Sequence, residues 1–171
     1  MANTIPDDDP RRKLTIARAD AADAVHVGLA GNTYTILLTG RDTAGRYCLI
    51  DMHVAPGGGP GPHRHDFEES FTVLEGEIEA MFRGERVTVR AGETINIPAN
   101  APHRFQNMSN VPARLLCVCS PAGQEEFFTE VGVRVSSRTE LPPPMNAAEQ
   151  AAFREKAGAL AQKYRTEMLP G

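Results

Sequence analysis

The sequence has no tryptophan, few aromatic residues and no cluster of basic residues. Aromatic residues make up 6% of the 171 positions, and the formal net charge is −4. A weakly acidic chain can still bind nucleic acid through a local basic patch, but this sequence contains neither such a patch nor an evident aromatic platform for stacked bases. Nucleic acid is therefore not expected as a partner.

Long apolar runs and paired cysteines are also missing. No run approaches the roughly 20 apolar residues that a membrane-spanning helix needs. The first thirteen residues are charged and interrupted by proline, so they do not form the apolar region of a signal peptide. The three cysteines, Cys48, Cys117 and Cys119, are an odd number, which argues against a disulfide framework. We expect a cytoplasmic protein with reduced, buried thiols that does not enter a membrane.

The chain length predicts one domain with short segments at either end. Residues 1–23 form an N-terminal arm that offers little to bury. From 24 to 120, short apolar and β-branched runs alternate with glycine, proline and asparagine at a spacing typical of a β-sandwich or barrel. Residues 121–171 form a C-terminal helical extension. The expected class is all-β with C-terminal helices.

Two helices are predicted in this extension. The first covers residues 124–132. The second covers residues 146–168, beginning at Asn146, which has Glu149 three positions later in capping-box spacing. Its apolar residues recur every three or four positions and should be covered by the barrel or by a partner subunit. They are Phe153, Ala157, Leu160, Tyr164 and Met168.

Three histidines and a glutamate form the candidate metal site. His63 and His65 are two residues apart, which places both imidazoles on one face of a strand. Glu69 follows on the same face if the chain stays extended, and His103 joins them if its strand pairs beside the first. Three nitrogens and one carboxylate suit a first-row divalent metal ion, so one iron, manganese, nickel, zinc, cobalt or copper ion per chain is possible by ligand type.

These residues lie in two blocks that resemble the paired signatures of the cupin superfamily. The first block has Gly57, His63, His65, Glu69 and Gly76, and the second has Gly92, Pro98, Asn100, His103 and Asn107. Asn100 stands where the family usually has glycine, but asparagine also tolerates left-handed backbone. The resemblance implies a double-stranded β-helix, the cupin jelly-roll barrel. It also implies that the metal ligands are His63, His65, Glu69 and His103, and that the chain forms a homodimer.

Several interpretations of the remaining residues stay open. A purely structural ion is the alternative to a functional one, but structural zinc sites are usually closed and often contain cysteine, and no cysteine falls in this cluster. Phe71 and Phe105 share side-chain parity with Glu69 and His103, so they are candidates for binding a substrate, with ordinary core packing as the alternative. Buried packing is the favoured role of Cys117 and Cys119.

The segment PAGQEEFFTEVG after the last expected strand is similar to one in small bacterial cupins that resemble quercetin 2,3-dioxygenase. The resemblance implies a metal-dependent dioxygenase that acts on a small aromatic or enolisable molecule. Glu69 would then be both a metal ligand and the catalytic base. The alternatives are a metal-dependent isomerase or lyase, which consumes no oxygen, and a non-enzymatic cupin that binds a small molecule.

Overall fold

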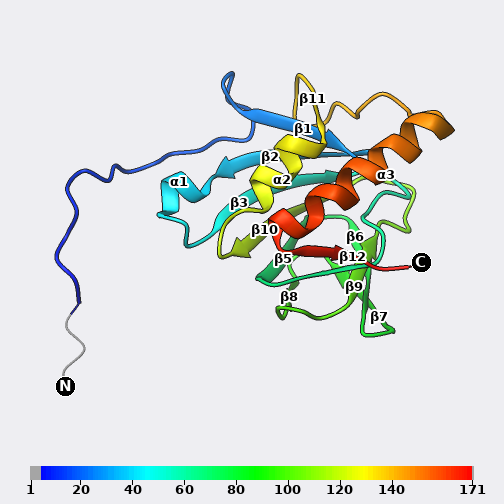
Figure 1. Cartoon of the computed structure of the whole chain (residues 1–171), viewed down its shortest axis with the longest axis horizontal. Coiled ribbons are helices and arrows are strands. Elements are labelled where there is room, and N and C mark those ends of the chain that lie inside the picture. The colour runs from blue at the N-terminus through cyan, green and yellow to red at the C-terminus, as the bar shows by residue number, and fades with distance from the viewer. Residues whose placement is uncertain (1–4, 171) are drawn as a thin grey trace.

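The computed structural model describes residues 5–170, and two antiparallel sheets face each other to form a barrel (Figure 1). The first sheet has the order β11-β1-β2-β3-β10-β5-β8. Its strands are β1 (Val25–Leu29), β2 (Asn32–Leu38), β3 (Cys48–Val54), β5 (Glu68–Glu75), β8 (Thr94–Ile97), β10 (Ala113–Ser120) and β11 (Val133–Arg134). This architecture is the double-stranded β-helix expected from the sequence.

The second sheet is smaller and has the order β12-β4-β9-β6-β7. Its strands are β4 (His63–His65), β6 (Glu77–Phe82), β7 (Glu85–Arg90), β9 (His103–Gln106) and β12 (Thr166–Met168). The helical elements are α1 (Gly40–Thr43), α2 (Gln124–Val131), α3 (Ala147–Ala161) and the 3-10 turn η1 (Gln162–Tyr164). Residues 5–23, the described part of the predicted arm, contain neither helix nor strand.

The core lies between the sheets because side chains alternate between core and solvent along each strand. On β10, Ala113, Leu115, Cys117 and Cys119 are buried and the residues between them are more exposed. On β5, every second residue is buried in the same way. This period of two is the pattern expected of a sheet with one face against a core.

Two backbone positions shape the entry to β4 and β9. Asn100, just before β9, has a φ of 68°, so the left-handed conformation expected of this asparagine is confirmed. Gly59 has a φ of 140°, and a Cβ there would lie 2.1 Å from the carbonyl oxygen of Phe105. The loop before β4 can therefore pack against β9 only because residue 59 has no side chain.

The C-terminal extension differs from its prediction at the far end. The helix at α2 is confirmed, and Asn146 caps α3 by accepting hydrogen bonds from the backbone amides of Ala148 and Glu149. However, the prediction of helix up to residue 168 was wrong, because α3 ends at Ala161 and the chain turns at Arg165 with a φ of 56°. Residues 166–168 then form β12, which pairs with β4.

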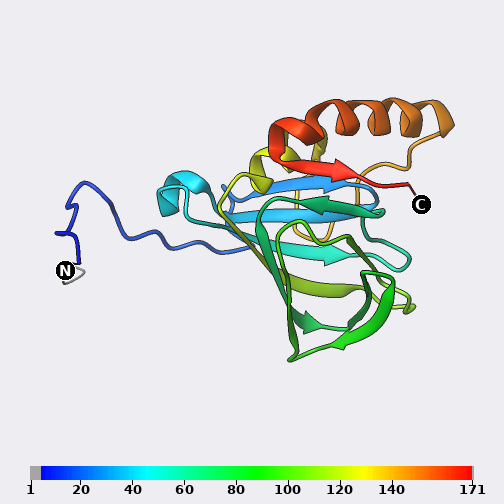
Figure 2. The same cartoon turned by 60° about the horizontal axis from the view of Figure 1, so that its bottom comes forward.

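The extension lies against the barrel (Figure 2). Ala157 is buried, and Phe153, Leu160 and Tyr164 are partly buried against the main core. The apolar stripe predicted from the sequence is therefore covered within one chain over most of its length. Within residues 5–170, no helix combines the length and the apolar character that crossing a membrane requires.

This packing predicts different effects for two identical substitutions on α3. Ala157→Glu places an unpaired carboxylate in a buried contact and is expected to lower the free energy of unfolding by about 2–4 kcal/mol. Ala159→Glu, on the exposed side of the same helix, should change it by less than about 0.5 kcal/mol. Urea denaturation of both full-length variants provides the measurement. Equal stability of the two variants would mean that α3 is not held against the barrel.

Candidate metal centre

The four predicted metal ligands converge at one place in the barrel. The donor atoms of His63, His65, Glu69 and His103 all lie within 4.8 Å of one another, and all four residues are buried. His63 on β4 pairs directly with His103 on β9. This cross-strand pair confirms the expectation that the strand carrying His103 lies beside the strand carrying His63 and His65.

Glu69 reaches the cluster by a different path from the one expected. His63 and His65 belong to the smaller sheet, whereas Glu69 lies on β5 of the larger sheet. The chain changes sheets between residues 65 and 68, so the expectation of one continuous strand face was wrong. The carboxylate still meets the imidazoles because the inner faces of the two sheets point at the same space.

Backbone carbonyls fix the orientation of all three imidazoles. The Nδ1 atoms of His63, His65 and His103 lie 2.8, 2.9 and 2.9 Å from carbonyl oxygens. A carbonyl oxygen only accepts hydrogen bonds, so each Nδ1 donates, and a neutral ring then carries its lone pair on Nε2. Ligating histidines are commonly held in this way, with the second ring nitrogen donating to a backbone carbonyl or a carboxylate.

The Nε2 atoms then face an oxygen that also offers lone pairs. Glu69 Oε2 lies 3.1 Å from His65 Nε2 and 3.2 Å from His103 Nε2. Neutral imidazoles and a carboxylate at these distances require a cation between them, either protons on the rings or a metal ion. The donor set therefore fits one divalent transition metal ion, with His63 as the further nitrogen ligand.

Of the two sources of that cation, the electrostatics of the side chains alone show ring protons: burial would lower the pKa of His103, but the hydrogen bond with Glu69 outweighs it and raises this pKa. Burial lowers the pKa of His63 to about 4, so this imidazole is neutral at pH 7. Burial alone would raise the pKa of Glu69, but the imidazoles of His103 and His65 outweigh it and hold the pKa well below its usual range. Glu69 is thus an anion inside the barrel, as a metal ligand has to be.

Two thiols contact the other oxygen of Glu69. Cys117 Sγ and Cys119 Sγ lie 3.6 and 3.7 Å from Glu69 Oε1. Burial raises the pKa of Cys117 to about 12, so this thiol keeps its proton and can donate to the carboxylate. All three cysteines are free and buried, as predicted. The contact with Glu69 was missed because it depends on the register that places Cys119 opposite Glu69 in the β10–β5 pair.

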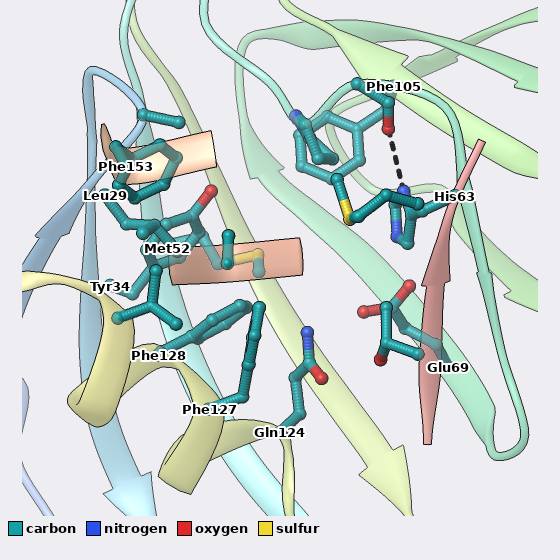
Figure 3. A pocket seen from close by; sticks show the side chains of 17 residues that line it. Leu29, Tyr34, Met52, His63, Glu69, Phe105, Gln124, Phe127, Phe128 and Phe153 are labelled. Carbon is teal, nitrogen blue, oxygen red and sulfur yellow. Dashed lines mark hydrogen bonds between the residues drawn. The ribbon is translucent and has the colours of Figure 1, made fainter. Parts of the chain in front are cut away.

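A cavity of about 120 Å³ borders the cluster, with His63 and Glu69 in its wall (Figure 3). Most of the wall is apolar and includes Leu29, Tyr34, Met52, Phe105, Phe127 and Phe128. Beyond α2, the C-terminal extension also contributes Phe153, Ala157, Thr166 and Met168. These four residues and the α2 residues of the wall were not among the predicted site residues.

The two candidate substrate-binding residues take different positions. Phe105 lines the cavity. Phe71 is buried one layer deeper, with its ring edge-to-face against Phe105 at 5.1 Å between centroids. Only Phe105 can therefore touch a molecule in the cavity without a rearrangement.

Comparison with known proteins gives matches along most of the barrel. A family described as Cupin domain matches residues 50–119. The TcmJ protein of the tetracenomycin polyketide synthase of Streptomyces glaucescens is 30% identical over 115 residues, which cover 67% of this chain and 77% of that protein. Quercetin 2,3-dioxygenase of Bacillus subtilis is 31% identical over 137 residues, which cover 80% of this chain but only 40% of the enzyme.

Solved structures agree on the architecture. The polyketide cyclase RemF of Streptomyces resistomycificus superposes with a TM-score of 0.53 at 28% identity, covering 62% of this chain and 80% of RemF. A predicted oxalate decarboxylase of Thermotoga maritima gives a TM-score of 0.55 at 20% identity, covering 63% of this chain and 99% of that one.

Another sequence relative, an uncharacterised protein of Methanocaldococcus jannaschii, is 37% identical over 65 residues, and this chain spans 52% of its length.

Proposed function

This chain belongs to the cupin superfamily, and from that premise we propose that it is a metal-dependent dioxygenase acting on a small aromatic or enolisable molecule. The observation that carries the proposal is the position of the His63, His65, Glu69 and His103 cluster at the wall of an apolar cavity. Apolar pockets with a few convergent polar groups are typical of small-molecule sites. The quercetin dioxygenase relative supports oxygen as the second substrate.

The four ligands would hold one divalent transition metal ion per chain. Such an ion supplies a Lewis acid that stabilises a substrate oxygen as an anion. Glu69 would accept the proton of the phenol or enol hydroxyl, since its carboxylate is ionised in the barrel and borders the cavity. Phe105 would contact the substrate ring, with Phe71 holding the ring of Phe105 from behind. The remaining apolar wall would exclude water from the reacting group.

A second candidate is an isomerase or lyase that uses the same centre without oxygen. The similarity to the polyketide cyclase RemF favours this alternative. An ion that polarises a carbonyl and a carboxylate that moves a proton would serve it equally. A cupin that binds a small molecule without turning it over is the non-enzymatic alternative.

Oxygen consumption separates these candidates. The protein is loaded separately with iron, manganese, nickel, cobalt or copper, and oxygen uptake is measured with an oxygen electrode in the presence of phenols, catechols, flavonols or 1,3-diketones. At least one of these classes is expected to cause oxygen uptake. The amount of oxygen consumed should be proportional to the product formed. The chain stripped of metal is the control. Conversion of a substrate without oxygen uptake would contradict the dioxygenase proposal and support an isomerase or lyase. Binding of a compound without conversion in any metal form would support a non-enzymatic binding protein.

Two other predictions from the sequence accompany this proposal. The resemblance to small cupins implies a homodimer, and the free buried thiols fit a cytoplasmic location. Both stay predictions. Sedimentation of the purified chain measures the first directly.

A further inference from the structure

The two carboxylate oxygens of Glu69 have different neighbours. Oε2 lies 3.1 Å from His65 Nε2 and 3.2 Å from His103 Nε2, the nitrogens that would bind the metal ion. Oε1 lies 3.6 Å from Cys117 Sγ and 3.7 Å from Cys119 Sγ. One oxygen therefore belongs to the metal centre, whereas the other is in contact with two thiols.

The side chain of Glu69 does not fix this orientation by itself. The last torsion of a glutamate side chain is broad and roughly two-fold, so the carboxylate can turn at little cost. Carboxylates bind cations through one oxygen or through both. A glutamate beside three imidazole ligands could therefore turn both oxygens toward the ion, unless a neighbouring group holds one of them back.

The two thiols are placed to hold Oε1. Both lie on the inner face of β10, where the β10–β5 register sets Cys119 opposite Glu69 and Cys117 opposite Phe71. Both are fully buried. Buried thiols keep their protons at pH 7, because the ordinary pKa of a thiol is about 8.5 and burial raises it. Each thiol then has one proton to donate, and the charged Oε1 is the strongest acceptor within reach.

The number of carboxylate oxygens on the ion decides what else can bind there. Three imidazoles and one carboxylate oxygen leave coordination positions open on an octahedral ion. A second oxygen from Glu69 would fill one of these positions. Glu69 and His63 border the cavity (Figure 3), so a position that stays open is available to a small molecule in it.

We propose that Cys117 and Cys119 are positioning residues that hold Glu69 so that it offers one oxygen to the ion and leaves one more coordination position open to a ligand. This inference rests on the proposed function only for the presence of an ion at the cluster. It holds equally for a dioxygenase, an isomerase or a lyase, since each requires an open position.

Azide binding to the cobalt-loaded full-length chain tests this inference without oxygen chemistry. Visible absorption reports azide on the ion. The double variant Cys117→Ala/Cys119→Ala is expected to bind azide about tenfold more weakly than the parent, because the hydrogen bonds that hold Oε1 back are gone. A chelator should remove cobalt from this variant no faster than from the parent, since Glu69 then binds through both oxygens. The matching double serine variant keeps two donors and should retain the parent affinity for azide.

The third cysteine provides a matched control. Cys48 is also fully buried and lies opposite Cys119 in the β10–β3 pair, but the thiols in contact with Glu69 are those of Cys117 and Cys119. Cys48→Ala removes the same atom from the same part of the core and should keep the parent affinity for azide. If the double alanine variant does not fold, Cys117→Ala and Cys119→Ala carry the same comparison singly, each with a smaller loss in the same direction.

The other outcomes contradict the proposal in different ways. Unchanged azide affinity in the alanine variants would show that the thiols do not control the open position. Faster loss of cobalt from them would show that the thiols support Glu69 as a ligand rather than hold one oxygen back. An equal loss of azide affinity in Cys48→Ala would assign the effect to core packing, and a parent chain that binds cobalt but no azide would have no open position. If the expected azide results are obtained but no metal form consumes oxygen, this inference stands and the dioxygenase proposal fails.

Discussion

Replacing His103 by alanine is expected to remove the metal ion and to abolish turnover. His103 supplies one of the four converging donor atoms, and its ring is already oriented by the carbonyl of Ala101. Loss of an outer residue that only orients a ligand typically costs about 10–100-fold in metal affinity, so loss of the ligand itself should cost at least about 100-fold. Elemental analysis after dialysis against a chelator measures the remaining metal per chain.

His53→Ala is the matched control for this experiment. His53 lies on β3, is half-buried and is not part of the cluster. This variant should keep as much metal as the parent chain. Full occupancy in His103→Ala under the same dialysis would show that the ion is held elsewhere.

Glu69→Gln is expected to lose far more activity than metal. The amide oxygen can still coordinate an ion weakly, but an amide cannot take a proton from the substrate. Loss of a general base typically lowers the rate about 10²–10⁴-fold. The measurement is the rate with saturating substrate per mole of metal actually bound, so that metal loss is separated from the loss of proton transfer.

Glu68, the residue next to Glu69, offers a matched control for the Glu69→Gln substitution. Glu68 lies on the outer face of β5 and accepts hydrogen bonds from Asn96 and the amide of Ala99. Glu68→Gln makes the same chemical change away from the cavity and should keep the parent rate. If Glu69→Gln and the parent have the same rate per bound metal ion, Glu69 is a metal ligand but not the catalytic base.

The metal cluster could be predicted from the sequence because the resemblance to the two signature blocks marks all four ligands. The spacing of His63 and His65 sets one face of a strand, and the two signature blocks supply Glu69 and His103. Contacts between distant strands that no signature block marks could not be predicted. Cys119 lies opposite Glu69 only in the β10–β5 register, which no pattern in either strand specifies.

The far end of the chain was mispredicted for a related reason. Tyr164 and Met168 continue the helical spacing of α3, so periodicity alone favours helix there. The backbone leaves the helix at Arg165, a residue that does not usually mark a left-handed turn, and Thr166 pairs with His65 instead. Tertiary pairing with an open strand edge outweighed a local preference, as it often does in short segments.

The β4–β12 pair also bears on the order in which the molecule assembles. Arg64 and Glu167, which are bonded across this pair, are 103 residues apart, and the entropy of closing so long a loop makes such contacts slow to form. Until β12 is in place, β4 has a free edge and the space beside His63 and His65 is open to solvent. We expect an ion to enter most readily at this stage and to exchange slowly once the strand has docked. The identity of the metal ion in the folded protein would then depend on which ions were available while the chain was folding.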